Sequence, residues 1–300
     1  MKKLLVLICF FVFAVTLIPL FVIHTKADEQ KIKVLFTDTN ETREVNLEEY
    51  LVGVVCAEMP ASFETEALRA QAVAARTYCV KKRADNSPHE GGADVCSNPS
   101  HCKAYTSREN YTGGDENYEK IRAAVRDTAG EILVYDGEPI LAAFHSSSGG
   151  RTEAAKEVWG GEYPYLVSVE SAGEEADSGY RDKIEMPFTE FRDKLLLSNN
   201  AVVLNSPADI SAPSFTAGGD VADIAIGGQS FSGGEIRLIF NLKSACFTIN
   251  ATNETVVIET IGYGHGVGMS QYGANAMAKE GKSKVDILTH YYSGCKIKKL

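Results

Sequence analysis

The first regular pattern along the chain is an apolar run, Leu4–Ile23, that is interrupted at only two positions. A helix needs about 20 apolar residues to cross a bilayer. Lys2 and Lys3 precede the run, and positive charges on that side keep an N-terminus in the cytoplasm. A cleaved signal peptide has a shorter apolar core of about 7–15 residues and a small-residue cleavage site, for which only Thr25–Ala27 is a candidate. The pattern therefore predicts an uncleaved single-pass anchor within residues 1–30, with a cleaved signal as the alternative, and export of the remaining chain.

Two helical patterns follow an alternating, strand-like segment at residues 31–40. From Leu47 to Glu58 the apolar residues recur at spacings of three and four, and Pro60 ends the pattern. A second helix is predicted over Glu64–Lys82, with a face of alanines that lets another element approach closely. Glu58 is the exception in this part of the chain, because a carboxylate occupies a position on the apolar stripe.

The remaining patterns predict an α+β fold of mixed helices and antiparallel strands, because helices and strands do not strictly alternate. Asp85–Tyr118 is rich in Gly, Ser, Asn and Asp and predicts a long loop that needs a tether. Asp136-Gly137 between two apolar runs predicts a hairpin, and the acidic segment Ala172–Asp182 predicts a surface loop. Further helices are predicted at residues 119–128, 187–197 and 231–242, further strands at 221–226 and 245–249, and a helix between Ser270 and Gly281. We expect residues 31–300 to form one exported domain, in one or two lobes.

Composition and charge narrow the possible partners. With 44% hydrophobic residues among 300, the chain has enough apolar content for a real core. The formal net charge of −10 argues against a nucleic-acid partner, which needs a basic face. Of seven cysteines, Cys9 lies in the apolar run, and the even number left in an exported domain permits disulfides. Cys56 and Cys79 lie in helical patterns, where we expect small buried thiols.

Glu58 has two interpretations. The simple one is a solvated helix end, although a carboxylate there faces the negative end of the helix dipole. The other is that the helix end and the apolar stripe both disfavour ionisation, so that the carboxyl group keeps its proton and can donate it. Cleavage of a glycosidic bond needs such an acid to protonate the leaving oxygen.

The predicted long loop contains two histidines and two cysteines within fourteen residues. These are His89, Cys96, His101 and Cys102. Two imidazoles and two thiolates fill a tetrahedral zinc, and a bound metal would tether the loop. Four protein ligands leave no open position for water, so the predicted metal is structural. The alternative is a disulfide between Cys96 and Cys102 with solvated histidines.

Two further segments have the composition of polar binding loops. "FHSSSGGRT" has no G-x-S-x-G nucleophile elbow, and the glycines of "YGHGVGMSQYG" do not form a dinucleotide fingerprint. Alternating glycines let the backbone run close to a ligand or to a neighbouring strand, so a tight structural turn is the alternative for the second segment. The candidate ligands for a polar substrate are His145, Ser146, Ser147, Arg151, His265, Ser270, Gln271 and Tyr272.

Four segments together resemble the stage II sporulation protein D (SpoIID) family of endospore-forming bacteria. They are "EEYLVGVVCAEMPASFETEALRAQAVAARTY", "FHSSSGGRTEAAKEVWGG", "SGGEIRLIFNLKSACFTI" and "GYGHGVGMSQYGANAMAKEGKSKVDILTHYYSG". The resemblance is collinear over roughly Ile32–Leu300 and includes the N-terminal anchor. It implies a substrate groove and a peptidoglycan lytic transglycosylase that cuts between N-acetylmuramic acid and N-acetylglucosamine, leaving 1,6-anhydro ends.

The resemblance also implies roles for residues and partners. Glu58 lies in the family's "AEMP" motif and would be the catalytic acid, and the histidine and cysteine pattern matches the zinc ligands of some members. The substrate would be glycan strands stripped of stem peptides by an amidase, stage II sporulation protein P, with the membrane protein stage II sporulation protein M as scaffold. The protein would act at the engulfing membrane of the mother cell.

Two other functions stay open at this point. A non-catalytic glycan-binding activator of a cell-wall amidase would need the same glycan contacts but not Glu58. A zinc hydrolase would need the metal for turnover rather than for stability.

Overall fold

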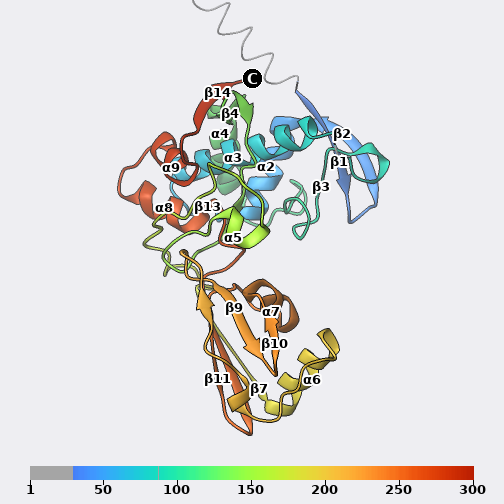
Figure 1. Ribbon diagram of the computed structural model, residues 1–300. Helices are drawn as coiled ribbons and strands as arrows, with labels where there is room; N and C mark the ends of the chain where they lie inside the picture. Colours follow the sequence, from blue (N-terminus) through green and yellow to red (C-terminus); the bar gives the residue numbers. More distant parts are fainter. Residues whose placement is uncertain (1–29, 87) are drawn as a thin grey trace, which may run out of the picture. The chain divides into compact units, whose positions relative to one another are not determined.

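A computed structural model of the chain describes residues 30–86 and 88–300 (Figure 1). The predicted anchor, Leu4–Ile23, lies outside these residues. Within the described ranges, no helix is both long and apolar enough to span a membrane. The described chain divides into two units: the first ends at Leu141 and takes back the C-terminal Lys296–Leu300, and the second is Ala142–Cys295. The described residues form eight α-helices and five small sheets, mostly antiparallel, in agreement with the predicted α+β class.

The first unit is built around the two predicted helices. Its elements are β1 (Lys31–Phe36), β2 (Glu41–Asn46), α2 (Leu47–Glu58), α3 (Thr65–Ala84), the 3-10 helix η1 (Glu90–Gly92), β3 (Val95–Cys96), α4 (Asp115–Asp127), β4 (Glu131–Tyr135), β5 (Glu138–Pro139) and β14 (Lys296–Lys299). The prediction for α2 is confirmed at both ends. Asn46 caps its N-terminus by accepting from the backbone N–H of Glu49, and Pro60 follows its end.

A buried ion pair connects the helices of this unit. The guanidinium of Arg76, on α3, has no exposed surface and donates twice to Glu48 of α2, at 2.8 and 2.6 Å. It also donates to the backbone carbonyls of Val125 and Glu131, at 3.2 and 3.1 Å. The Glu48 carboxylate therefore neutralises the buried positive charge, and the backbone carbonyls accept further N–H groups of the guanidinium.

The predicted hairpin is confirmed, whereas the predicted long loop contains more structure than expected. β4 and β5 pair around Asp136 and Gly137, whose φ angles of 50° and 90° are those of a primed hairpin turn. Inside the predicted loop, β3 pairs in parallel with β1, matching Leu35 with Cys96. Helix α4 also begins at Asp115, four residues before the predicted start. Pairing with β1 is therefore one tether of this loop.

The second unit combines two three-stranded sheets with helices. Its elements are β6 (Phe144–His145), α5 (Ala155–Trp159), β7 (Arg181–Pro187), α6 (Phe188–Ser198), the 3-10 helix η2 (Pro207–Asp209), β8 (Ser214–Phe215), β9 (Val221–Ile226), β10 (Gln229–Phe231), α7 (Gly233–Phe240), β11 (Phe247–Ala251), β12 (Thr255–Ile261), β13 (Met269–Ser270), α8 (Gln271–Lys279) and α9 (Lys284–Tyr291). Strands β11, β12 and β7 form one antiparallel sheet and β10, β9 and β8 another. Figure 1 shows α7 beside β9 and β10, and Phe191 of α6 stacks on Phe240 of α7 in the core that these elements share.

The prediction of an exposed acidic loop at Ala172–Asp182 is wrong for two of its carboxylates. The segment is irregular up to the start of β7, but Glu174 is 1% exposed and Asp177 is 7% exposed. Both carboxylates accept hydrogen bonds from serines of the "HSSS" segment. Hydrogen bonds from these serines allow the two carboxylates to be buried. The serines lie in another segment, so the acidic composition of residues 172–182 alone does not indicate the burial.

Candidate functional site

Glu58 is the last residue of α2, and its carboxyl group is held by one backbone hydrogen bond. The N–H of Ala104 donates to Oε1 at 2.9 Å, and the side chain is half-buried. The carbonyl oxygen of a carboxylic acid is a better acceptor than its hydroxyl oxygen, so a backbone N–H bonded to Oε1 favours the proton on Oε2. Oε2 is therefore the oxygen that can carry an acidic proton.

Lys103 lies next to this contact and was not among the predicted site residues. The side chain is buried, with its ammonium 4.7 Å from the centre of the Tyr78 ring. Burial lowers the pKa of Lys103 to about 8, and the negative charge of Glu58 acts in the opposite direction. A lysine in a polar loop is normally solvated, so the sequence carries no signal for this position.

The four predicted metal ligands lie together in the first unit. The ligand atoms of His89, Cys96, His101 and Cys102 all lie within 4.8 Å of one another. The Sγ of Cys102 is 3.3 Å from Nε2 of His89 and 3.5 Å from Nδ1 of His101. The Sγ of Cys96 is 3.8 Å from the same Nδ1.

These separations fit a tetrahedral zinc site. Zn–S bonds of about 2.3 Å and Zn–N bonds of about 2.0–2.1 Å at tetrahedral angles place sulfur and nitrogen roughly 3.6 Å apart. Both thiols are free in the structure, so the alternative disulfide between Cys96 and Cys102 is not formed there. The four side chains form a cluster that can bind a metal ion such as zinc.

The two predicted binding loops are neighbours in the second unit. β6 and β13 pair in parallel, which places Ser270 opposite His145. The N–H of Tyr272 donates to the carbonyl of Ser146 at 3.0 Å, and Ser147 pairs with Tyr263. Residues more than 100 positions apart therefore form one structural region.

One glycine shows why the second loop is glycine-rich. Gly268 has a φ of 77°, and a Cβ there would lie 2.1 Å from the carbonyl oxygen of Ala143. Gly268 therefore lets the backbone pass close to the segment that leads into β6, in line with the structural alternative predicted for these glycines.

Both histidines of this region are fixed by the backbone of Val267. Its carbonyl accepts from Nδ1 of His145 at 3.2 Å, and its N–H donates to Nδ1 of His265 at 3.1 Å. The ring centres of the two histidines are 5.7 Å apart. His145 is buried and His265 is half-buried.

The hydroxyls of the candidate serines make hydrogen bonds within the protein. Ser146 and Ser147 donate to Oδ2 of Asp177 at 3.0 and 2.5 Å. Ser270 is buried and caps α8 by accepting from the N–H of Gly273 at 3.1 Å, as its predicted position before a helix implies. These hydroxyls hold the region together.

The other three candidate ligands differ in exposure. Arg151 is exposed and lies 3.6 Å from the exposed carboxylate of Glu170. Gln271 is 5% exposed, and its Nε2 has no hydrogen-bond partner among the described residues. Tyr272 is half-buried.

A pair of carboxylates under the glycine-rich loop was missed by sequence reasoning. Glu153 is 1% exposed, donates its N–H to the carbonyl of Gly266, and accepts at Oε1 from the N–H of Asp220 at 2.9 Å. Burial raises the pKa of Asp220 to about 7; the charge of Glu153 acts in the same direction and that of Arg237 in the opposite one. These carboxylates are 67 residues apart in the sequence, so no local pattern connects them.

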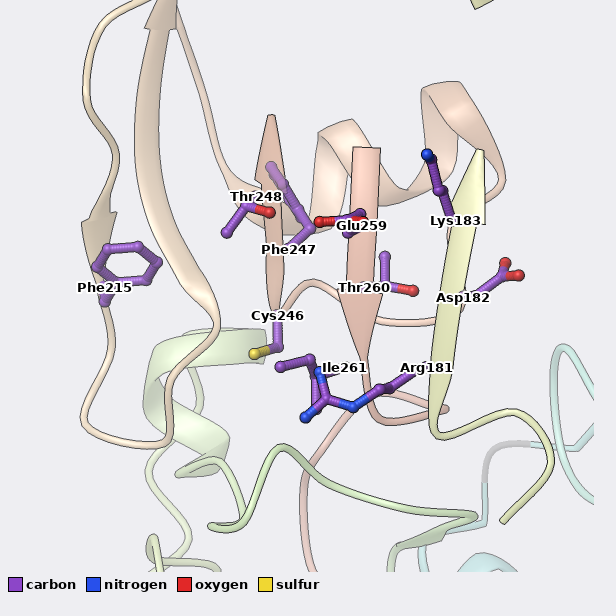
Figure 2. A pocket seen from close by; sticks show the side chains of 10 residues that line it. All are labelled: Arg181, Asp182, Lys183, Phe215, Cys246, Phe247, Thr248, Glu259, Thr260 and Ile261. Atoms are coloured by element: carbon purple, nitrogen blue, oxygen red, sulfur yellow. The ribbon is translucent and has the colours of Figure 1, made fainter. Parts of the chain in front are cut away.

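The second unit also has a pocket of about 500 Å³ along β7, β11 and β12 (Figure 2). Figure 2 shows Phe215 on one side and Arg181 and Cys246 at one end. None of the predicted site residues lines this pocket.

Comparison with known proteins supplies the family. The family model "SpoIID: Stage II sporulation protein" matches residues 36–135, and stage II sporulation protein D of Bacillus subtilis is 38% identical over 279 residues, covering 91% of this chain and 80% of that protein. The chain belongs to the SpoIID family. Another SpoIID relative, stage II sporulation protein D of Bacillus amyloliquefaciens, is 39% identical over 283 residues, covering 91% of this chain and 80% of its own length. The amidase enhancer of Bacillus subtilis is 30% identical over 297 residues, which are 81% of this chain and 39% of that protein.

Proposed function

We propose that this chain is a peptidoglycan lytic transglycosylase that acts in sporulation, cutting the bond between N-acetylmuramic acid and N-acetylglucosamine in strands without stem peptides. The observation that carries the proposal is the carboxyl group of Glu58. It is held at a helix end by the N–H of Ala104, with Oε2 left for proton transfer, in the segment that the SpoIID family model matches.

In this proposal Glu58 acts first as an acid and then as a base. Oε2 donates its proton to the glycosidic oxygen, and the bond between that oxygen and C1 of the muramic acid breaks. The 6-hydroxyl of the same sugar then bonds to C1, and its proton passes to the Glu58 carboxylate. The product is a 1,6-anhydro end, and no water is consumed. One carboxylate therefore serves both steps.

The second unit supplies the glycan-binding residues in this proposal. His145, His265 and Arg151 carry polar groups suited to sugar hydroxyls, and Gln271 and Tyr272 begin the adjacent helix α8. Ser146, Ser147 and Ser270 contribute chiefly by positioning these groups, since their hydroxyls already bond within the protein.

The proposed cofactor is one structural zinc ion held by His89, Cys96, His101 and Cys102. The donor set and the sulfur–nitrogen separations support it. When bound, the ion would supply cross-linking of the loop and no open coordination position. Cys102 is two residues before Ala104, so one segment, the metal loop (residues 89–104), contains both the four candidate ligands and the N–H that contacts Glu58.

The proposed setting is the engulfing membrane of the mother cell, with a single N-terminal anchor and the enzyme domain outside. The amidase stage II sporulation protein P would supply stripped strands, and stage II sporulation protein M would be the scaffold. Membership of a family named for stage II of sporulation supports this setting.

The proposed chemistry is tested with purified stripped glycan strands and mass spectrometry of the products. We expect anhydro-ended fragments from the wild type and a rate about 100- to 10,000-fold lower for Glu58→Gln. Glu49→Gln is the matched control, because Glu49 is an exposed carboxylate on the same helix. Undiminished anhydro products from Glu58→Gln would remove Glu58 from the mechanism.

A second candidate is a non-catalytic activator of a cell-wall amidase, which the similarity to the amidase enhancer favours. It predicts that the chain alone releases no glycan fragments. Adding the chain, wild type or Glu58→Gln, would then raise stem-peptide release by an amidase to the same extent. A dependence of fragment release on Glu58 excludes this candidate as the complete function.

A further inference from the structure

The only tryptophan of the chain lies beside the histidine pair of the second unit. Trp159 is the last residue of α5, and 43% of its surface is exposed. An indole is a large, rigid apolar surface with one polar N–H, which suits a ligand that has both an apolar face and polar groups. A sugar ring is such a ligand, because axial C–H groups form a face and hydroxyls surround it.

The contact between Trp159 and His265 leaves the indole accessible. Their ring centres are 5.2 Å apart and their planes are inclined by 61°, an edge-to-face arrangement. His265 therefore covers at most one face of the indole. His265 also contacts His145, so the three rings form a continuous group within one unit.

Hydrogen bonds to Val267 determine which polar atoms the neutral histidines present. His265 accepts at Nδ1, so its hydrogen is on Nε2 and that atom is a donor. His145 donates from Nδ1, so its Nε2 is an acceptor. Nε2 of His145 is buried, so this ring supports His265 rather than facing a ligand. The Nε2 donor of His265 beside an aromatic surface matches an N-acetylated sugar, whose hydroxyl and acetamido oxygens accept.

The ring group is also held rigidly. The N–H of Ala155 donates to the carbonyl of Leu166 at 3.0 Å, and Gly160 ends α5 with a φ of 72°. The loop that carries His265 is fixed through Gly266, whose carbonyl accepts from Glu153 at 2.7 Å. A rigid binding surface loses little entropy when it binds a ligand.

We propose that Trp159 forms a sugar-binding subsite with His265, in which the indole stacks on one pyranose ring of an N-acetylated glycan and the buried ring of His145 supports His265. This inference rests on the proposed function, since it assumes that the chain binds glycan strands. Trp159 is a binding residue here and takes no part in proton transfer.

Tryptophan fluorescence tests the subsite directly, because every signal comes from Trp159. The full chain in detergent, with Glu58→Gln to prevent cleavage, is titrated with stripped glycan strands while fluorescence and heat release are both recorded. We expect a saturable fluorescence change with the same midpoint as the calorimetric binding curve. In the same background, Trp159→Phe should keep Kd within about threefold and Trp159→Leu should raise it about tenfold.

The Phe and Leu variants separate stacking from simple packing, since both keep apolar bulk but only Phe keeps an aromatic face. Phe215→Ala is the matched control: it removes another exposed aromatic side chain of the same unit, at the pocket of Figure 2, and should leave Kd unchanged. Calorimetric binding without a fluorescence change, and with equal affinity in Trp159→Leu, would overturn the subsite and leave the proposed function standing. If only Phe215→Ala loses affinity, the glycan-binding site would lie at that pocket and not at Trp159. Absence of any binding would overturn both proposals.

Discussion

Two carboxylates ten positions apart on α2 have opposite surroundings. Glu48 is buried, and both of its oxygens accept from the Arg76 guanidinium. Glu58 is half-buried and accepts a backbone hydrogen bond from Ala104. Glu48 is therefore a structural residue, whereas Glu58 has an oxygen that can take part in chemistry.

The buried ion pair leads to a prediction about stability. Glu48→Gln leaves the charge of Arg76 in the interior without a counter-charge, and we expect the free energy of unfolding to fall by about 3–5 kcal/mol. Glu44→Gln is the control, because Glu44 pairs with Lys31 at the surface, with both side chains at least half exposed, and should cost at most about 1 kcal/mol. Denaturant unfolding measures both. Equal midpoints for the two variants would contradict the structural role of Glu48.

Asp220 predicts a specific dependence of stability on pH. Burial and the charge of Glu153 raise its pKa to about 7, and the charge of Arg237 only partly offsets them. Between about pH 4 and 7 the folded protein therefore binds more protons than the unfolded chain. Stability from this group is therefore present at low pH and is lost as the pH rises through 7. We expect the melting temperature of the wild type to fall relative to Asp220→Asn across this range. Parallel curves for the two proteins would contradict the raised pKa.

At the scale of elements, the metal loop is the segment whose role is most open to test. It carries the four candidate metal ligands and, two residues after Cys102, the N–H that contacts Glu58. A structural metal adds its binding free energy to folding. We expect chelation, and equally Cys102→Ser, to lower the melting temperature, whereas Cys56→Ser, outside the cluster, should retain both the metal and the response to chelation. Lost turnover with an unchanged melting temperature would instead favour a zinc hydrolase.

Local elements could be predicted from the sequence far better than long-range pairings. The bounds of α2 and the turn at Asp136 follow from nearby residues, and the structure has both. The pairing of β3 with β1, and of β6 with β13, joins segments tens to more than a hundred residues apart, for which periodicity gives no register. For the same reason the acidic partners of the "HSSS" serines could not be predicted, because Glu174 and Asp177 lie in a segment whose composition indicates solvent exposure.

At the scale of the whole molecule, the candidate chemistry is divided between two units of one chain. Glu58 and the candidate metal cluster belong to the first, and the histidine pair with Trp159 belongs to the second. The sequence shows no linker at this division, because Leu141 and Ala142 lie inside an apolar run without Gly or Pro. Local sequence patterns also do not predict that β14 returns to the first unit and pairs with β4.

The apolar run near the N-terminus could hold the whole chain at a membrane in the cell. If the apolar run Leu4–Ile23 is an uncleaved anchor, the intact protein should sediment with membranes, resist extraction by alkaline carbonate and dissolve in detergent. A variant without residues 1–30 should no longer sediment with membranes, because the apolar run that would hold it there has been removed. Intact mass measured on the membrane fraction decides between anchor and signal. A mass that lacks the first residues up to about Ala27 would mean that the run is a cleaved signal, and that attachment to the membrane requires another partner.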